Sequence, residues 1–331
     1  MAISQQAFEQ YTVAFYNLEN LFDVHNDEHI LDQDFTAQGR KQWTPQRYQK
    51  KLQKLSEAIS KVGILQTGKL PAIIGVAEVE NEKVLEDLIQ QPKLVKGDYG
   101  IIHYNSPPDE RGIDVALLYS KKIFTVQSST PIAVDVTMPN DEPDRTRDIL
   151  YVKGFLSGMP LHIYVNHWPS RRDGGADSTN EKRVTVAKQL MSHINNVDPQ
   201  NDRTNQEKHL LEGTNIIIMG DFNDDPENDS IRNEILPHGF QNVTAPLKKF
   251  HRGSLNHNFK WNLFDQIMVS DSLINDVPDA LYFHQADIFD DIMLRQWKGK
   301  YRGQPARTFV GKTYKGGYSD HFPVFMILRR N

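Results

Sequence analysis

The sequence predicts an α/β protein in which β-sheets form a sandwich that helices cover. Seven short apolar runs rich in Val, Ile, Phe and Tyr recur along the chain, at 12–16, 73–77, 113–119, 161–165, 215–219, 264–269 and 323–328. Several runs are nearly continuous rather than alternating, which is typical of strands covered on both faces. Amphipathic segments between the runs predict the helices that supply this cover.

Two segments carry the periodicity of helices. The clearer one begins at Thr44-Pro45, a capping residue followed by a proline in the first turn. Its apolar stripe follows at spacings of four, three, four and three residues, through Tyr48, Leu52, Leu55, Ile59 and Val62. The second is predicted from Glu181 to Ile194, and the side chains expected to face inward are Val184, Ala187, Leu190, Met191 and Ile194.

Composition limits the class of protein. The 331 residues are 38% hydrophobic and 24% charged, so the chain can build a sizeable core. A formal net charge of −5 argues mildly against a protein that coats nucleic acid nonspecifically, although it leaves room for a local basic groove. Length alone would allow two domains, yet large β-sandwiches reach this size as one unit.

The chain has no cysteine, which excludes disulfides, thiolate metal sites and cysteine nucleophiles. Any metal must therefore be bound by oxygen and nitrogen. No window approaches the roughly 18 apolar residues of a membrane span, and residues 1–6 lack the features of a signal peptide. We expect a soluble, cytoplasmic protein, unless an export signal has been removed from it.

Four polar stretches are predicted to be surface loops: 24–43, 135–149, 196–213 and 286–317. The last mixes cations with aromatic residues, namely Arg295, Lys298, Lys300, Arg302, Arg307, Lys312 and Lys315 with Trp297, Tyr301, Phe309 and Tyr314. Such a mixture suits a phosphate backbone and stacked bases. The alternative is a solvated loop that is packed by its own rings.

Ligand-type and acid/base side chains stand at the ends of six apolar runs. They are Asn17, Glu78, His167, Asp221 with Asn223, Asp265, and the adjacent Asp320 and His321. A scaffold selected only for stability would place turn formers at these positions. The pattern therefore indicates an active site.

Three of these residues suit a hard metal ion. Asn17, Glu78 and Asp320 are oxygen donors, the ligands that Mg²⁺ and Mn²⁺ prefer. They are too few for a closed cage, so water and substrate oxygens would complete the shell. Taken singly, Asn17 could be a turn residue and Glu78 a helix-capping acid.

The two strand-end histidines have different neighbours. His321 follows Asp320, and Asp265 could fix its tautomer as carboxylates do in hydrolytic sites. His167 is followed by Trp168-Pro169-Ser170-Arg171-Arg172, whose two arginines could clamp a phosphate. A salt bridge within the loop is the plain alternative for Arg171. The stretch Gly220 to Pro226 could likewise be only an acidic turn that closes a strand.

The ordered set of motifs resembles the endonuclease/exonuclease/phosphatase superfamily over roughly 12–328. The motifs are Asn17, Glu78, Arg111 to Asp114, His167, Gly220-Asp221-Phe222-Asn223, Asp265 and Ser319-Asp320-His321. The resemblance implies a four-layer α/β sandwich, two mixed β-sheets face to face with helices on the outside, as a single domain over 8–331. It also implies a site at one edge of the sheets.

The resemblance assigns roles to these residues. Glu78, with Asn17 and Asp320, would hold Mg²⁺ or Mn²⁺. His321, oriented by Asp265, would activate water, Asp221 and Asn223 would position nucleophile and phosphate, and His167 would bind or protonate. Arg111 matches a phosphate-contacting arginine of the deoxyribonucleases, and Asp114 and Arg171 are expected on the substrate side. One departure is Asn166, which directly precedes His167 where many members have a spacer, so its role stays open.

The sequence thus predicts a metal-dependent hydrolase of phosphoester bonds, foremost a nuclease acting on DNA or RNA. The alternatives are a phosphatase or a sphingomyelinase-like phosphodiesterase on a small or lipid phosphoester. Residues 262–267 lack the Trp-Cys-Asp-Arg character expected of inositol phosphatases, and no exposed apolar hairpin suggests a lipase. A non-catalytic binding protein is disfavoured because no ligand or base of the family pattern is missing.

Overall fold

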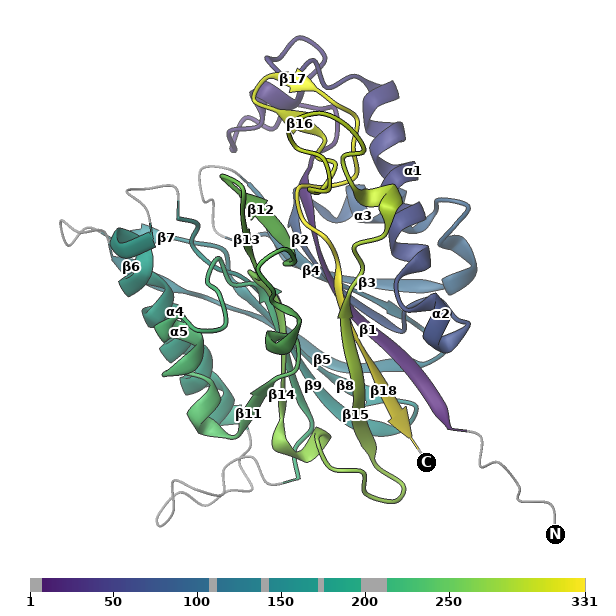
Figure 1. Ribbon diagram of the computed structural model, residues 1–331, viewed down its shortest axis with the longest axis vertical. Coiled ribbons are helices and arrows are strands. Elements are labelled where there is room, and N and C mark those ends of the chain that lie inside the picture. Colours follow the sequence, from purple (N-terminus) through teal and green to yellow (C-terminus); the bar gives the residue numbers. More distant parts are fainter. Residues whose placement is uncertain (1–7, 107–111, 138–142, 172–175, 198–212, 331) are drawn as a thin grey trace.

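Two six-stranded mixed β-sheets lie face to face, with helices on their outer faces, in a computed structural model of the chain (Figure 1). The structure describes residues 8–106, 112–137, 143–171, 176–197 and 213–330. Arg111 and most of the predicted loop 196–213 lie outside the described residues. The four-layer α/β sandwich expected from the sequence is confirmed.

Each sheet has a parallel pair at its centre. The first sheet has the order β15 (Leu281–Ile288), β18 (Val324–Arg330), β1 (Glu9–Leu21), β2 (Ile73–Val79), β4 (Asp114–Ser120) and β3 (Tyr99–His103), with β1 parallel to β2. The second has the order β11 (Phe240–Asn242), β14 (Asp265–Ser270), β10 (Ile216–Asp221), β9 (Met159–His167), β8 (Ile149–Leu156) and β5 (Phe124–Ile132), with β10 parallel to β9. All seven predicted runs form strands.

Parallel neighbours need a crossover connection, and helices supply it on both sides of the sandwich. Helices α1 (Pro45–Lys61) and α2 (Ile64–Thr67) connect β1 to β2, and α4 (Ala176–Val197) connects β9 to β10. Figure 1 shows α1, α2 and α3 (Glu82–Ile89) against the first sheet, and α4 with α5 (Asp229–Arg232) against the second. Both central strand pairs are thereby covered on both faces.

Strand β10 shows how a continuous apolar run is used. Ile217 and Met219 pack into the core between the sheets, whereas Ile216 and Ile218 pack into the core beneath α4. The sheets approach so closely that a Cβ added at Gly75 of β2 would lie 2.9 Å from the Met219 sulfur. A strand that is covered on both faces does not alternate apolar and polar residues, as the sequence predicted.

The predicted helices are confirmed with one change of face. Thr44 caps α1 by accepting a hydrogen bond from the Arg47 amide, and the apolar stripe of α1 is buried. In α4 the buried valine is Val186, whereas Val184 is only partly buried. No helix in the described part of the chain is both long and apolar enough to cross a membrane.

Two predicted loops contain short strands. The stretch 135–149 includes β6 (Asp135–Thr137) paired with β7 (Pro143–Arg145), and 286–317 includes β16 (Phe309–Val310) paired with β17 (Thr313–Tyr314). Within 24–43, Phe35 and Trp43 pack against Phe309 through ring contacts of 6.2 and 5.8 Å. A further hairpin, β12 (Leu255–His257) and β13 (Lys260–Asn262), stands beside the second sheet (Figure 1).

Candidate active site

The strand register collects the predicted residues at one edge of the sandwich. Asp221, the last residue of β10, is paired with His167 of β9 on one side and with Asp265 of β14 on the other. In the first sheet, Asn17 is paired with Ala77, directly before Glu78. Parallel pairing places these ends together within each sheet, and the contact of Asn17 with Asp221 at 3.0 Å joins the edges of the two sheets.

A register shift and a positive φ orient the side chain of Glu78 toward the other residues at this edge. The pairing of β2 with both neighbours shifts between Ala77 and Val79, and Glu78 has a positive φ of 61°. Asn20 also has a positive φ, 52°, and its amide donates to Glu78 Oε2 at 2.9 Å. A bulge re-aims the side chain it carries, and non-glycine residues with positive φ cluster at functional sites.

Asp221 is the centre of the polar contacts. Its Oδ2 lies 3.0 Å from Asn17 Nδ2, 3.8 Å from His167 Nε2 and 3.9 Å from His321 Nε2. Its Oδ1 accepts a hydrogen bond from the Asn223 amide at 3.0 Å. Burial raises the pKa of Asp221 to about 7; the nearby Asp265 adds to this effect and His321 opposes it.

His321 has a dedicated orienting carboxylate. Its Nδ1 lies 2.6 Å from Asp265 Oδ2, and Asp265 is fully buried. Ser319 fixes the backbone: its hydroxyl donates to Asn17 O at 2.7 Å and accepts the His321 amide at 3.1 Å. Burial opposes the charged imidazolium, but Asp265 and Asp221 outweigh it and hold the pKa of His321 well above its usual range.

His167 faces the opposite side of the cluster. Its Nε2 lies 3.9 Å from Glu78 Oε1 and 3.8 Å from Asp221 Oδ2. The Asn17 amide nitrogen, 3.3 Å from Glu78 Oε1, lies between the same two carboxylates. The two imidazoles therefore flank a space bordered by acidic oxygens.

Asp320 forms the outer wall of this space. Its Oδ1 lies 3.9 Å from His321 Nε2, and its Oδ2 accepts a hydrogen bond from Arg307 Nη2 at 2.7 Å. Burial would raise the pKa of Asp320, yet the positive charges of His321, Arg307 and Lys51 hold it below its usual value. Arg307 therefore borders the site; the sequence placed it among the cations of the loop 286–317 but did not predict its contact with Asp320.

The donor set fits a hard cation. Glu78, Asp221 and Asp320 supply carboxylate oxygens, which is the chemistry of Mg²⁺ and Mn²⁺ sites. Donor atoms of Asp221, Asp265 and His321 also lie within 4.8 Å of one another, but Asp265 and His321 already bind each other. Ligation of the ion by Glu78 and Asp320 stays a prediction.

The orientation of the Asn17 side chain does not suit a metal ligand directly. Its Oδ1 accepts the Glu19 amide at 2.9 Å, so the side chain presents its NH₂ group to Glu78 and Asp221. In this orientation it bridges two carboxylates as a donor. Ligation of a metal through Oδ1 would require the amide to rotate, and the role of Asn17 as a ligand stays a prediction.

Two expected substrate contacts are occupied by the protein itself. Arg171 donates to Asn223 O at 2.7 Å and to Asp224 Oδ1 at 2.9 Å, which is the loop salt bridge left open by the sequence. Asp114 is buried and accepts the Ser106 amide at 3.2 Å. The side chain of Asn223 donates to Trp168 O at 3.0 Å. Direct roles of these residues toward a substrate stay predictions.

A buried lysine supports the site from beneath. Lys51 of α1 donates to Tyr318 O and to Thr308 Oγ1, each at 2.6 Å, and lies 3.8 Å from Glu19 Oε2. These contacts secure the segment that carries Asp320. Sequence reasoning missed Lys51, although it lies three residues after Tyr48 and four before Leu55, on the buried face of the helix.

The role of Asn166 is structural. It is fully buried, donates to Met219 O at 3.2 Å and accepts the Trp168 indole N–H at 3.1 Å. A Cβ added at Gly220 would lie 2.4 Å from Asn166 O, so the strand next to it must carry glycine there. Asn166 thus fixes the end of β9, directly before His167.

Comparisons with known proteins agree with this fold. The sequence profile of the Endonuclease/Exonuclease/phosphatase family matches residues 12–330. Among curated proteins, no sequence matches the chain significantly. A family protein from Bacteroides thetaiotaomicron superposes with a TM-score of 0.57 at 17% identity, over 98% of this chain and 96% of that chain.

Two further solved structures share the fold. D. rerio TDP2 complexed with single strand DNA product has a TM-score of 0.53 at 13% identity, over 96% of this chain and 98% of that chain. A mannosyl-6-phosphatase from B. thetaiotaomicron has a TM-score of 0.56 at 16% identity, over 96% of this chain and 99% of that chain. At such identities the likeness shows the fold alone.

Proposed function

The chain belongs to the endonuclease/exonuclease/phosphatase family, which includes metal-dependent nucleases and phosphatases, and from this premise we propose that it is a nuclease. It would hydrolyse phosphodiester bonds of DNA or RNA with Mg²⁺ or Mn²⁺ bound. The observation that carries the proposal is the 2.6 Å contact between Asp265 and His321, which turns the other imidazole nitrogen toward Asp221 and Asp320. This is an oriented base beside a buried carboxylate cluster.

Hydrolysis requires a bond from water oxygen to phosphorus and loss of the bond from phosphorus to the leaving oxygen. His321 Nε2 would accept the proton of the attacking water, while Asp265 holds the tautomer that frees this nitrogen. His167, on the opposite side of Asp221, would donate a proton to the departing oxygen. Glu78 and Asp320, with Asn17, would hold the divalent ion, which neutralises phosphate charge when bound.

The protonation of His321 is consistent with this scheme once a cation is present. The surrounding carboxylates keep its pKa high, so the free site favours the imidazolium. A divalent cation held by Glu78 and Asp320 would place positive charge near His321 and lower that pKa. A lower pKa favours the neutral imidazole, which is the form that can accept a proton.

A polynucleotide is favoured over a small phosphoester because a groove continues from the site. The groove has a volume of about 560 Å³, and Asp320 lines it together with Arg307, Lys298, Lys300 and Lys315. Cations along such a groove suit the successive phosphates of a chain. We propose that residues 8–331 act as one domain, since both sheets contribute to the site.

A panel of substrates tests the proposal. Plasmid DNA, RNA, a small chromogenic phosphodiester and a phosphomonoester would be incubated with Mg²⁺, with Mn²⁺ and with EDTA. We expect metal-dependent cleavage of DNA or RNA, whose products also distinguish endo from exo cleavage. Turnover of the monoester alone would replace the nuclease by a phosphatase, and inertness toward all four substrates would contradict phosphoester hydrolysis.

A further inference from the structure

An aromatic platform stands in the groove beside the proposed hydrolytic site. Phe259 is 55% exposed and Tyr301 is 46% exposed, yet their rings are stacked at a centroid distance of 5.7 Å with an interplanar angle of 6°. Lys300 lies over both rings, 5.0 Å from the centroid of Phe259 and 5.8 Å from that of Tyr301. The pair joins two segments that are distant in the sequence.

Phe259 adopts a backbone conformation that is unfavourable for a residue with a side chain. It follows Asn258 in the two-residue turn between β12 and β13, and both residues have positive φ, 49° and 65°. Hairpins with such turns prefer Asn followed by Gly, because glycine adopts positive φ without steric cost. A phenylalanine there is strained because its Cβ disfavours positive φ, and strain of this kind points to function.

The hairpin is fixed to the Asp265 and His321 pair. Leu255 of β12 forms a β-bridge with His321, and Ser254 O accepts the Phe322 amide at 2.7 Å. The Ser254 hydroxyl also accepts the Asp265 amide at 3.1 Å. The platform therefore has a defined position relative to the proposed base.

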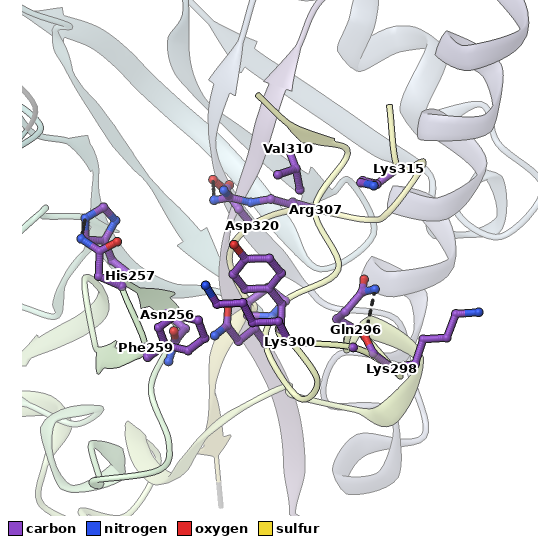
Figure 2. Close-up of a pocket in the computed structure, with 15 residues that line it drawn as sticks. Asn256, His257, Phe259, Gln296, Lys298, Lys300, Arg307, Val310, Lys315 and Asp320 are labelled. Atoms are coloured by element: carbon purple, nitrogen blue, oxygen red, sulfur yellow. Dashed lines mark hydrogen bonds and ion pairs between the residues drawn. The ribbon is translucent and has the colours of Figure 1, made fainter. Parts of the chain in front are cut away.

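The groove around the platform carries positive charge on one side and reaches the site on the other. Figure 2 shows Phe259 and Lys300 in the same pocket as the linked Arg307 and Asp320. Lys298 and Lys315 line it as well. An exposed aromatic surface with cations beside it matches a flat base attached to a phosphate backbone.

We propose that the Phe259 and Tyr301 pair is a stacking platform for an unpaired nucleobase of the strand being cut, with Lys298 and Lys300 on its phosphates. This subsite deepens the proposed function and rests on it for the identity of the substrate. It assigns the enzyme a preference for single-stranded or frayed polynucleotide. A perfectly paired duplex keeps its bases stacked on each other and cannot use the platform.

Binding without turnover tests the platform. Fluorescence anisotropy would compare a short single-stranded oligonucleotide with an abasic chain of the same phosphate count, in EDTA at low salt. Wild type is expected to bind the base-bearing chain roughly tenfold more tightly. Phe259→Gly and Tyr301→Ala should each remove most of this preference, and Tyr301→Phe should retain it.

The variants carry their own controls. Phe259→Gly relieves the positive φ, so its melting temperature should equal or exceed that of wild type, which separates lost binding from lost folding. Phe250→Ala removes a phenylalanine that is 88% exposed and does not line the groove, and it should bind both chains as wild type does.

Three results would overturn the platform. They are equal binding of the two chains by wild type, an unchanged base preference in Phe259→Gly, and tighter binding of blunt duplex than of single strand. Hydrolysis of a small phosphodiester by wild type with Mn²⁺, measured in parallel, separates the two proposals. If that substrate is cleaved while base preference is absent, only the platform fails; if no phosphoester is cleaved, the proposed function fails.

Discussion

The sheet edge and the groove beside it are built in contrasting ways. At the edge, Asp221 and Asp265 are almost fully buried, and adjacent strands set their spacing. In the groove, Phe259 and Tyr301 are about half exposed, and a turn and a loop supply them. The edge can therefore hold a fixed chemical geometry, whereas the exposed rings of the groove can contact different substrates.

Because of this contrast, substitutions at the edge and in the groove should affect different properties of the enzyme. Changes at the edge should reduce the rate for every phosphoester, because they alter the reacting groups. Changes in the groove should alter the choice among substrates and their response to salt. Variants at the edge and in the groove test that separation.

Replacing the proposed base should have the largest effect. His321→Ala is expected to lower the single-turnover rate about 10²–10⁴-fold, the usual contribution of a general base. The exposed His251→Ala serves as the matched control and should cleave at the wild-type rate. If His321→Ala cleaves as fast as wild type while folded, the base has been assigned wrongly.

Removing Glu78 should abolish most of the metal-dependent rate without unfolding the protein. Glu78→Ala is expected to lose on the order of 10²-fold in kcat with Mg²⁺, since a proposed ligand is removed. Its melting temperature should stay near that of wild type, because the change removes one carboxylate from an acidic cluster and opens no core cavity. Full activity in Glu78→Ala would move the metal to other residues.

Asp265→Asn should reduce the rate less than His321→Ala and should also change its pH dependence. The Asp265 carboxylate is a main reason why the pKa of His321 is high. Losing that charge lowers the pKa, so the acid limb of the kcat profile should shift to lower pH. An acid limb that stays in place or shifts to higher pH would contradict the pairing.

Neutralising the groove cations should have a smaller and more selective effect. Lys298→Gln with Lys300→Gln is expected to weaken single-strand binding and to flatten its dependence on salt. The slope of log affinity against log salt should decrease in magnitude by about 0.7 for each phosphate that the variant no longer neutralises. An unchanged slope would remove both lysines from the path of the substrate.

The smallest effect concerns folding rather than chemistry. His103 of β3 is partly buried, and this burial lowers its pKa to about 4. The neutral form is therefore favoured in the folded state, and stability should be retained above about pH 6.5 and lost as the pH falls toward 4. His103→Gln should reduce this loss by on the order of 1–2 kcal/mol in urea unfolding at pH 4.5 compared with pH 7. Equal losses in both proteins would remove His103 as the cause.

The sequence predicted the edge well because strand ends are local features. Glu78, His167, Asp221, Asp265 and His321 each follow or begin an apolar run, and the structure brings them together. The sequence did not predict the strand pairing that places Asp221 between His167 and Asp265, because strand register depends on residues that are distant in the chain.

Other features depend on long-range contacts or on conformation. Lys51 meets Tyr318 across 267 residues of sequence, which no local pattern reveals. The loop 286–317 proved to be divided: Phe309 packs in the core, whereas Trp297 and Tyr301 are exposed. The Phe259 turn was missed because Asn-Phe is not a usual hairpin signal, and its strain is visible only in the backbone.

We propose that metal bound at the sheet edge drives phosphodiester hydrolysis. The most direct test is the initial rate of cleavage of a small phosphodiester by wild type in Mn²⁺ and after chelation with EDTA, followed by addition of excess metal. We expect turnover with metal, its loss on chelation and its return when metal is restored. Turnover that continues unchanged in EDTA would show that hydrolysis does not need a bound metal.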